Sequence, residues 1–376
     1  MTSHDIEIML AEKGKACLSI IIPTKKFGHE RQQNHELIDK AITREQILVK
    51  HSSWPKEVIQ QLQERLKQIP ARIEQIRLDE GLAIFISPNV FKIYSLPFPV
   101  TEKVMLGNSF EVRDLIYFHQ FLRPYYLLAV SRQRVRLLKG NGRELHEVIN
   151  DDFPKRYVEE YEYERPSVGN SSGVALKSVE PDKSILSDTR IRTFFRSADE
   201  ALRKYLKPEI PLFVAGVNEE IADFEKVSSH ARQITGKIRG NYDVDAVHPL
   251  AEMAWRKLKQ DLQLENRELL LKLDDAFGRH LAVDGIVNVW KAAYAGQGRT
   301  LIIEKDYVQR AFVKPARPDQ LFLFPPVDKH EVLHDAGDDL IELVKEKGGN
   351  VTVVDNGDLK DFQQVALILR YANGQG

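Results

Sequence analysis

The fold is decided by the stretch Tyr126-Leu-Leu-Ala-Val-Ser-Arg-Gln-Arg-Val-Arg-Leu-Leu138. Residues 126–131 are apolar and predict a buried strand, and residues 131–133 turn the chain. In residues 134–138 arginine alternates with valine and leucine, which is typical of a half-exposed strand. A third apolar run, Pro211-Leu-Phe-Val-Ala-Gly216, ends in glycine and predicts another strand. We expect the strands at 126–131 and 211–216 to share one sheet.

Similar patterns extend to both sides of this central unit. On the N-terminal side, a strand at residues 17–23 precedes two amphipathic helices and a hairpin over residues 82–95. On the C-terminal side, a helix ends at Gly348-Gly349 and is followed by strands at 351–355 and 365–371. The sequence therefore predicts an α/β protein with three domains, at residues 1–123, 124–272 and 273–376.

Composition excludes several classes of protein. The chain has 376 residues, 43% of them apolar, which is enough for more than one hydrophobic core. Cys17 is the only cysteine, so neither an internal disulfide nor a cysteine-cluster zinc site can form. The net charge of −1 gives no global support to nucleic-acid binding, whether of DNA or of RNA, although it does not exclude RNA binding. No apolar run approaches the roughly 20 residues that cross a bilayer. We therefore expect a cytoplasmic protein with neither a membrane nor a DNA partner.

The central unit contains a long loop followed by a helix with exposed arginines. Residues 151–187 are rich in proline and glycine and show poor periodicity, which indicates either a functional loop or an insert without a role. Glycine-bearing loops allow close backbone approach to RNA, and arginines contact phosphates, although the arginines would also fit a solvated helix face. The candidate RNA-binding residues are Gly169, Asn170, Ser171, Ser172, Gly173, Arg190, Arg192, Arg196 and Arg203.

A second candidate site is His330-Glu331-Val332-Leu333-His334, which matches the H-E-x-x-H pattern of zinc hydrolases. On a helix, the two histidines would share a face and bind zinc while Glu331 activated a water. Leu340 stands where the longer version of the pattern has a third histidine, and no other ligand has a usable spacing. We therefore expect no metal at this motif and no cofactor elsewhere. The sequence contains no nucleophile-elbow, phosphate-loop or kinase motif, and no catalytic residue can be assigned.

Five stretches together resemble a known family. They are Leu18-Ser-Ile-Ile-Ile-Pro-Thr24, Gly81-Leu-Ala-Ile-Phe85, the Tyr126–Leu138 stretch, Pro211-Leu-Phe-Val-Ala-Gly-Val217 and Asp361-Phe-Gln-Gln-Val-Ala-Leu-Ile-Leu-Arg-Tyr371. Their order and spacing are similar to those of the bacterial branch of the archaeo-eukaryotic release factor and Pelota superfamily.

The resemblance implies an N-terminal domain particular to the bacterial branch and an RNase H-like middle domain. It also implies a C-terminal α/β sandwich like the kink-turn-binding ribosomal proteins. In many family members the middle domain carries a Gly-Gly-Gln loop that helps water cleave peptidyl-tRNA. The loop at 151–187 matches by position, but this sequence contains no Gly-Gly-Gln. Pelota-like members lack that motif too and rescue ribosomes without hydrolysis.

The function that we predict is therefore action at the ribosome, in termination-like or rescue-like work, with the ribosome or tRNA as partner. Hydrolysis of the peptidyl-tRNA ester stays open, because the glutamine that would position the water is missing. Two alternatives remain. One is a zinc-dependent hydrolase that uses His330, Glu331 and His334, and the other is a non-catalytic interaction protein on the same scaffold.

Overall fold

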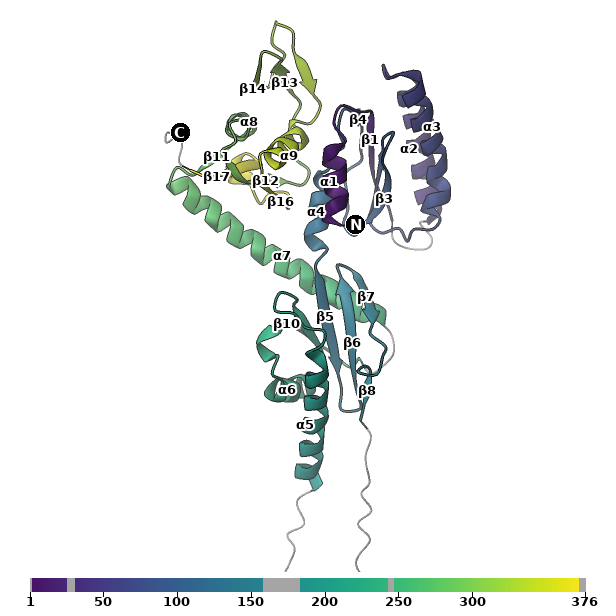
Figure 1. Ribbon diagram of the computed structural model, residues 1–376, viewed down its shortest axis with the longest axis vertical. Coiled ribbons are helices and arrows are strands. Elements are labelled where there is room, and N and C mark those ends of the chain that lie inside the picture. The colour runs from purple at the N-terminus through teal and green to yellow at the C-terminus, as the bar shows by residue number, and fades with distance from the viewer. Residues whose placement is uncertain (1, 26–30, 158–182, 243–246, 372–376) are drawn as a thin grey trace, which may run out of the picture. The chain divides into compact units, whose positions relative to one another are not determined.

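The computed structural model describes residues 2–25, 31–157, 183–242 and 247–371 (Figure 1). The chain divides into two compact units. The first combines Met1–Phe121 with Leu262–Gly376, and the second is Leu122–Asp261. Both units contain sheets and helices, so the predicted α/β class is confirmed.

The second unit is built on a six-stranded sheet with the order β10-β9-β5-β6-β7, in which β8 also pairs with β6. Its strands are β5 (Pro124–Val130), β6 (Arg134–Asn141), β7 (Glu144–Glu147), β8 (Lys155–Arg156), β9 (Leu212–Gly216) and β10 (Ile234–Arg239). β5, β9 and β10 run parallel, and β6 is antiparallel to β5. The two apolar strands that we expected in one sheet are direct neighbours, because Leu128 pairs with Val214.

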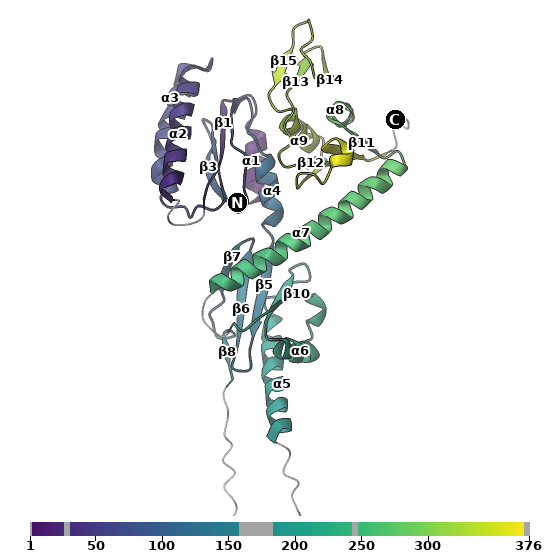
Figure 2. The same ribbon diagram turned by 180° about the vertical axis from the view of Figure 1, so that it is seen from behind.

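Two helices cover one face of this sheet, α5 (Lys183–Leu202) and α6 (Asn218–Val227). They pack side by side (Figures 1 and 2). Phe195 of α5 and Phe224 of α6 meet edge-on at 6.1 Å between ring centroids and are both fully buried. The first turn of α5 and the strand β8 both lie within residues 151–187, which we expected to be loop. β8 forms because Lys155 and Arg156 pair with Val135 and Arg134 of β6, a contact that the local sequence does not predict.

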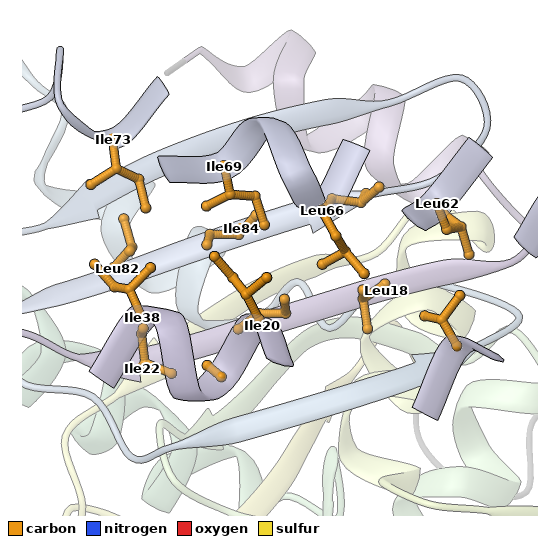
Figure 3. Close-up of a cluster of buried hydrophobic side chains, with 14 of the residues drawn as sticks. Leu18, Ile20, Ile22, Ile38, Leu62, Leu66, Ile69, Ile73, Leu82 and Ile84 are labelled. Atoms are coloured by element: carbon orange, nitrogen blue, oxygen red, sulfur yellow. The ribbon is translucent and has the colours of Figure 1, made fainter. Parts of the chain in front are cut away.

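The N-terminal part of the first unit is an antiparallel sheet with the order β3-β2-β1-β4. Its elements are α1 (Ser3–Ala11), β1 (Cys17–Pro23), α2 (Arg31–Lys50), α3 (Lys56–Ile73), β2 (Gly81–Ile86), β3 (Phe91–Leu96), β4 (Lys103–Gly107) and α4 (Arg113–Phe121). The apolar residues of α3 at spacings of three and four, from Leu62 to Ile73, pack onto Ile20 and Ile84 of the sheet (Figure 3). This periodicity was the basis for predicting α3.

The C-terminal part of the first unit has a four-stranded sheet with the order β11-β17-β12-β16 and a separate three-stranded sheet with the order β14-β13-β15. Its strands are β11 (Ala282–Asp284), β12 (Gly298–Glu304), β13 (Ala311–Lys314), β14 (Arg317–Phe322), β15 (Glu331–Leu333), β16 (Asn350–Val354) and β17 (Val365–Leu369). Its helices are α7 (Val247–Gly278), which starts in the second unit, α8 (Ile286–Tyr294) and α9 (Ala336–Glu346). The three-stranded sheet was not predicted from the sequence, and it projects beyond α8 and α9 (Figure 2).

Candidate nucleic-acid interface

The buried side chains of α5 determine which of its residues face solvent, and so where the candidate arginines lie. Ile191, Phe195, Ala198 and Leu202 recur at spacings of three and four and are buried in the core of the second unit. Because an α-helix has 3.6 residues per turn, this stripe turns the opposite side of α5 toward solvent.

Three of the four predicted arginines lie along one flank of that exposed surface. Arg196 follows Arg192 by four residues, and Arg203 lies one residue beyond the end of α5. At about 100° per residue, these spacings place all three within one narrow stripe. Arg190 is two residues before Arg192, which puts it about 200° away around the helix. All four side chains are exposed, but the structure groups only Arg192, Arg196 and Arg203, and we call these three the arginine stripe.

Among the described residues, the arginine stripe shares its lack of ion pairs with other exposed cations of this unit, such as Arg190, Lys207 and Arg232, whereas four further cations are paired. Arg132 pairs with Glu219 at 3.1 Å, Lys204 with Asp152 at 2.8 Å, and Lys226 with Asp223 at 3.0 Å. Lys237 pairs with Glu225 at 2.7 Å. Among the residues that the structure describes, none forms an ion pair with an arginine of the stripe. The stripe is therefore a patch of positive charge that is not neutralised by these neighbours.

Two acids, Asp199 and Glu200, are equally near the stripe in sequence; Glu200 is exposed, whereas Asp199 is turned inward. Its carboxylate accepts hydrogen bonds from Ser228 Oγ at 2.5 Å, Ser229 N at 2.8 Å, Ser229 Oγ at 2.6 Å and His230 Nδ1 at 2.8 Å. Burial alone would raise the pKa of Asp199, but the hydrogen bonds from Ser228, Ser229 and His230 hold it below its ordinary value. The carboxylate is thus ionised, and its charge is satisfied inside the protein rather than on the arginine stripe.

Serine, histidine and aspartate meet here, but not in the order of a catalytic triad. A triad histidine faces aspartate with one ring nitrogen and serine with the other. His230 uses Nδ1 toward Asp199, and the Ser229 hydroxyl lies 3.4 Å from that same nitrogen. Both serine hydroxyls donate to the carboxylate. The cluster therefore fixes the loop after α6 against α5 and offers no activated nucleophile. The sequence did not reveal it, because Asp199 and His230 are 31 residues apart.

The residue just before the undescribed part of the predicted loop, Tyr157, is held by a contact with a helix. Tyr157 follows β8 and contacts Phe194 of α5, with ring centroids 5.7 Å apart. The loop candidates Gly169, Asn170, Ser171, Ser172 and Gly173 lie outside the described residues.

The H-E-x-x-H motif lies on a strand rather than on a helix. Glu331–Leu333 form β15, which pairs with β13, and α9 begins only at Ala336. On a strand that rises about 3.3 Å per residue, residues four apart are roughly 13 Å apart. His330 and His334 therefore lack the shared helix face that the zinc motif requires. His330 Nδ1 lies 2.8 Å from the Asp328 carbonyl oxygen.

A cluster of carboxylates with metal-like spacing occurs in the first unit instead. Carboxylate oxygens of Glu111, Asp335 and Asp338 all lie within 4.8 Å of one another. Arg113 already supplies positive charge there, since its Nη2 donates to Asp335 at 2.7 Å and its Nε lies 3.4 Å from Asp338. Burial, followed by the charge of Asp338, raises the pKa of Glu111 well above its ordinary value. Because burial favours the neutral form of Glu111 and Arg113 already supplies positive charge, we interpret the cluster as a buried ion-pair network.

The structure thus groups three exposed arginines, on α5 and just beyond its end, that form no ion pair with a described residue. Residues 124–297 match the model of a family described as "Bacterial archaeo-eukaryotic release factor family 3". The resemblance predicted from the sequence is therefore confirmed over these residues, which include the arginine stripe.

Several solved structures are similar to this chain at low sequence identity. Pelota from Archaeoglobus fulgidus is 13% identical, with 79% of this chain and 86% of that chain covered and a TM-score of 0.39. A translation termination-like factor from S. cerevisiae is 12% identical, with 76% and 74% covered and a TM-score of 0.37. The archaeal translation termination factor aRF1 is 15% identical, with 99% of each chain covered and a TM-score of 0.26. TM-scores this low do not establish a shared overall arrangement.

Two further comparisons gave negative results. No curated protein matches the sequence. Within the described part of the chain, no helix combines the length and the apolar character needed to span a membrane.

Proposed function

We propose that this protein acts at the ribosome, in a termination-like or rescue-like step, and that the arginine stripe contacts RNA. The observation that carries the proposal is the grouping of Arg192, Arg196 and Arg203 in one exposed stripe that forms no ion pair with the described residues, within a segment that matches a release factor family. Arginine binds phosphate oxygens in a bidentate way, and each neutralised phosphate releases counterions.

The finer domain assignments belong to the same proposal. The parallel trio β5, β9 and β10, joined to the antiparallel strands β6 and β7, supports an RNase H-like reading of the second unit. The sheet β11-β17-β12-β16 with α8 and α9 supports the comparison of the C-terminal part with kink-turn-binding ribosomal proteins. On this proposal the partner is the ribosome or tRNA, the compartment is the cytoplasm, and neither DNA nor a membrane takes part.

Binding rather than hydrolysis is the better supported activity. The sequence has no Gly-Gly-Gln, and Asp199, His230 and Ser229 do not form a catalytic triad. We therefore favour a rescue-like role in which the protein occupies the ribosome. Ester cleavage by a different arrangement of the 151–187 loop is the alternative.

Co-sedimentation with purified bacterial ribosomes tests this proposal. The triple variant Arg192→Ala, Arg196→Ala, Arg203→Ala should bind at least roughly tenfold more weakly than the wild type, because three phosphate contacts are lost. The matched control is Arg132→Ala, Lys226→Ala, Lys237→Ala, which removes the same charge from cations that already have carboxylate partners. Equal binding by both triple variants would show that net charge, and not the stripe, governs the interaction.

Failure of the wild-type protein to co-sediment at low salt would instead favour a non-catalytic interaction protein on this scaffold. Stoichiometric zinc that is lost in His334→Ala would favour the hydrolase alternative, although the strand geometry of this motif argues against it.

A further inference from the structure

The imidazole of His230 lies beside the arginine stripe, although this residue belongs to the loop after α6. Its Nδ1 is 2.8 Å from Oδ1 of Asp199. Asp199 follows Arg196 by three residues and precedes Arg203 by four. Side chains at these spacings are neighbours on a helix, with Cβ atoms about 5–6 Å apart. The contact with Asp199 therefore places His230 next to two arginines of the stripe.

The hydrogen bonds around Asp199 determine which ring nitrogen of His230 carries the proton. Because the carboxylate of Asp199 is ionised, it can only accept, so the proton lies on Nδ1. The hydroxyls of Ser228 and Ser229 donate to the same carboxylate at 2.5 and 2.6 Å. In the neutral imidazole, Nε2 is then a hydrogen-bond acceptor.

This acceptor is available to a ligand. Among the described residues Nε2 has no hydrogen-bond partner, because the polar contacts of the ring, to Asp199 and Ser229, are both made by Nδ1. The two ring nitrogens diverge, so Nε2 is directed away from Asp199, and the side chain is 14% exposed. A group that is held in place before binding loses little conformational entropy when it meets its partner.

The surroundings of His230 indicate which donor this acceptor would meet. Arg232, two residues further along the loop, is exposed and forms no ion pair with a described residue. Together with the arginine stripe it favours a polyanion. A phosphodiester offers only acceptors, so it cannot donate to Nε2. The 2′-hydroxyl beside each phosphate of RNA can donate, and DNA lacks it.

We propose that His230 Nε2 accepts a hydrogen bond from a ribose 2′-hydroxyl, so that the Asp199–His230 pair selects RNA over DNA at the arginine stripe. The arginines bind phosphates, which are the same in both nucleic acids. Asp199 is a positioning residue that fixes the orientation and the tautomer of the imidazole. This inference rests on the proposed RNA contact of the stripe and adds the chemical basis of its selectivity.

Fluorescence anisotropy of the full chain with three short single-stranded probes of one sequence tests the inference. The probes are RNA, DNA and 2′-O-methyl RNA, which keeps the ribose oxygen but removes the donor. The wild type should bind RNA about three- to tenfold more tightly than the other two probes, the effect of one hydrogen bond. Equal affinity of the wild type for RNA and 2′-O-methyl RNA would overturn the inference without any variant.

The main variant is His230→Asn. The asparagine amide can donate to Asp199 in place of Nδ1, but it has no atom at the position of Nε2. This variant should bind all three probes alike, with the affinity of the wild type for DNA. A urea unfolding midpoint close to that of the wild type shows that the loop still packs against α5. If a protonated His230 bound phosphate instead, His230→Asn would weaken RNA and DNA binding by the same factor, and the inference would be wrong.

Two controls separate this inference from the proposed function. His146→Asn changes an exposed histidine of β7 in the same unit and should bind like the wild type. The triple variant Arg192→Ala, Arg196→Ala, Arg203→Ala should bind all three probes more weakly and keep the preference for RNA. If that variant loses affinity while His230→Asn keeps the preference for RNA, the inference fails and the stripe remains the RNA contact. A wild type that binds none of the probes would contradict the RNA contact of the stripe itself, and the selectivity with it.

Discussion

Arg113 and Asp335 form a buried ion pair, in which Arg113 Nη2 donates to Asp335 Oδ2 at 2.7 Å. The two side chains are 1% and 3% exposed. Asp335 is also the N-cap of α9, because its other oxygen accepts from Gly337 N at 3.0 Å. The carboxylate of Asp335 thus accepts a hydrogen bond from a free backbone N–H at the start of α9 and also neutralises the guanidinium of Arg113 at the start of α4.

We predict that Arg113→Ala destabilises the first unit by about 3–5 kcal/mol, because it leaves Asp335 and Asp338 buried without their counter-charge. Urea denaturation measures the loss. Arg132→Ala breaks an exposed pair with Glu219 and should change stability by only about 0–1 kcal/mol. Similar small effects of both substitutions would mean that the buried pair contributes nothing to the fold.

We predict that ionisation of the buried carboxyl group of Glu45 lowers the free energy of unfolding as the pH rises. Its side chain is fully buried in α2, and neither carboxylate oxygen has a hydrogen-bond partner among the described residues. Burial raises the pKa of Glu45 above its ordinary value of 4.5, although Arg44 opposes the shift. The protonated form is favoured in the folded state, so its stabilisation is present below about pH 4.5 and is lost as the pH rises through the raised pKa.

We expect Glu45→Leu to increase stability by about 1–3 kcal/mol at neutral pH and to have little effect in acid. Unfolding midpoints of both proteins across this pH range give the comparison. A gain that is independent of pH would contradict the assignment of the titration to Glu45.

Asp199 should have the opposite dependence on pH. Its pKa is lowered from 3.8 by three neighbouring residues that donate to it, so its stabilisation is present above about pH 3.8 and is lost as the pH falls through the lowered pKa. Asp199→Asn should cost about 1.5–3 kcal/mol at neutral pH, because hydrogen bonds to a charged acceptor are lost. Asp223→Asn, which affects an exposed pair with Lys226, is the control. Acid unfolding curves that coincide for wild type and Asp199→Asn would refute this prediction.

Gly140 should tolerate no larger residue. A Cβ atom at this position would lie 2.1 Å from the ring of Tyr125, its cross-strand neighbour. That ring is buried and lies 5.2 Å from Phe213, so it has little room to move. Gly140→Ala should destabilise the second unit by about 1–3 kcal/mol in thermal or urea unfolding. Gly278→Ala, where a Cβ meets open space, should be neutral or slightly stabilising, and the reverse order would contradict the packing argument.

The sequence predicted those features that depend on local pattern. Periodicity identified α3, the apolar runs identified β5 and β9 as partners, and Gly348-Gly349 marked the end of α9. Contacts between distant residues could not be predicted in this way. Arg113 and Asp335 are 222 positions apart, and the short strand β15 between His330 and His334 depends on its pairing with β13. For the candidate site, the helix period was enough to predict that the arginines of the stripe are exposed. Whether they form ion pairs depends on where the acidic side chains of other elements lie, and the sequence does not give this.

The salt dependence of ribosome binding tests the central claim most directly. If the arginine stripe contacts phosphates, a plot of log affinity against log salt concentration should become shallower by about three for Arg192→Ala, Arg196→Ala, Arg203→Ala, one for each lost contact. The control Arg132→Ala, Lys226→Ala, Lys237→Ala should keep the slope of the wild type. A slope that is the same for all three proteins would contradict the account, because the stripe would then be only a solvated face of α5.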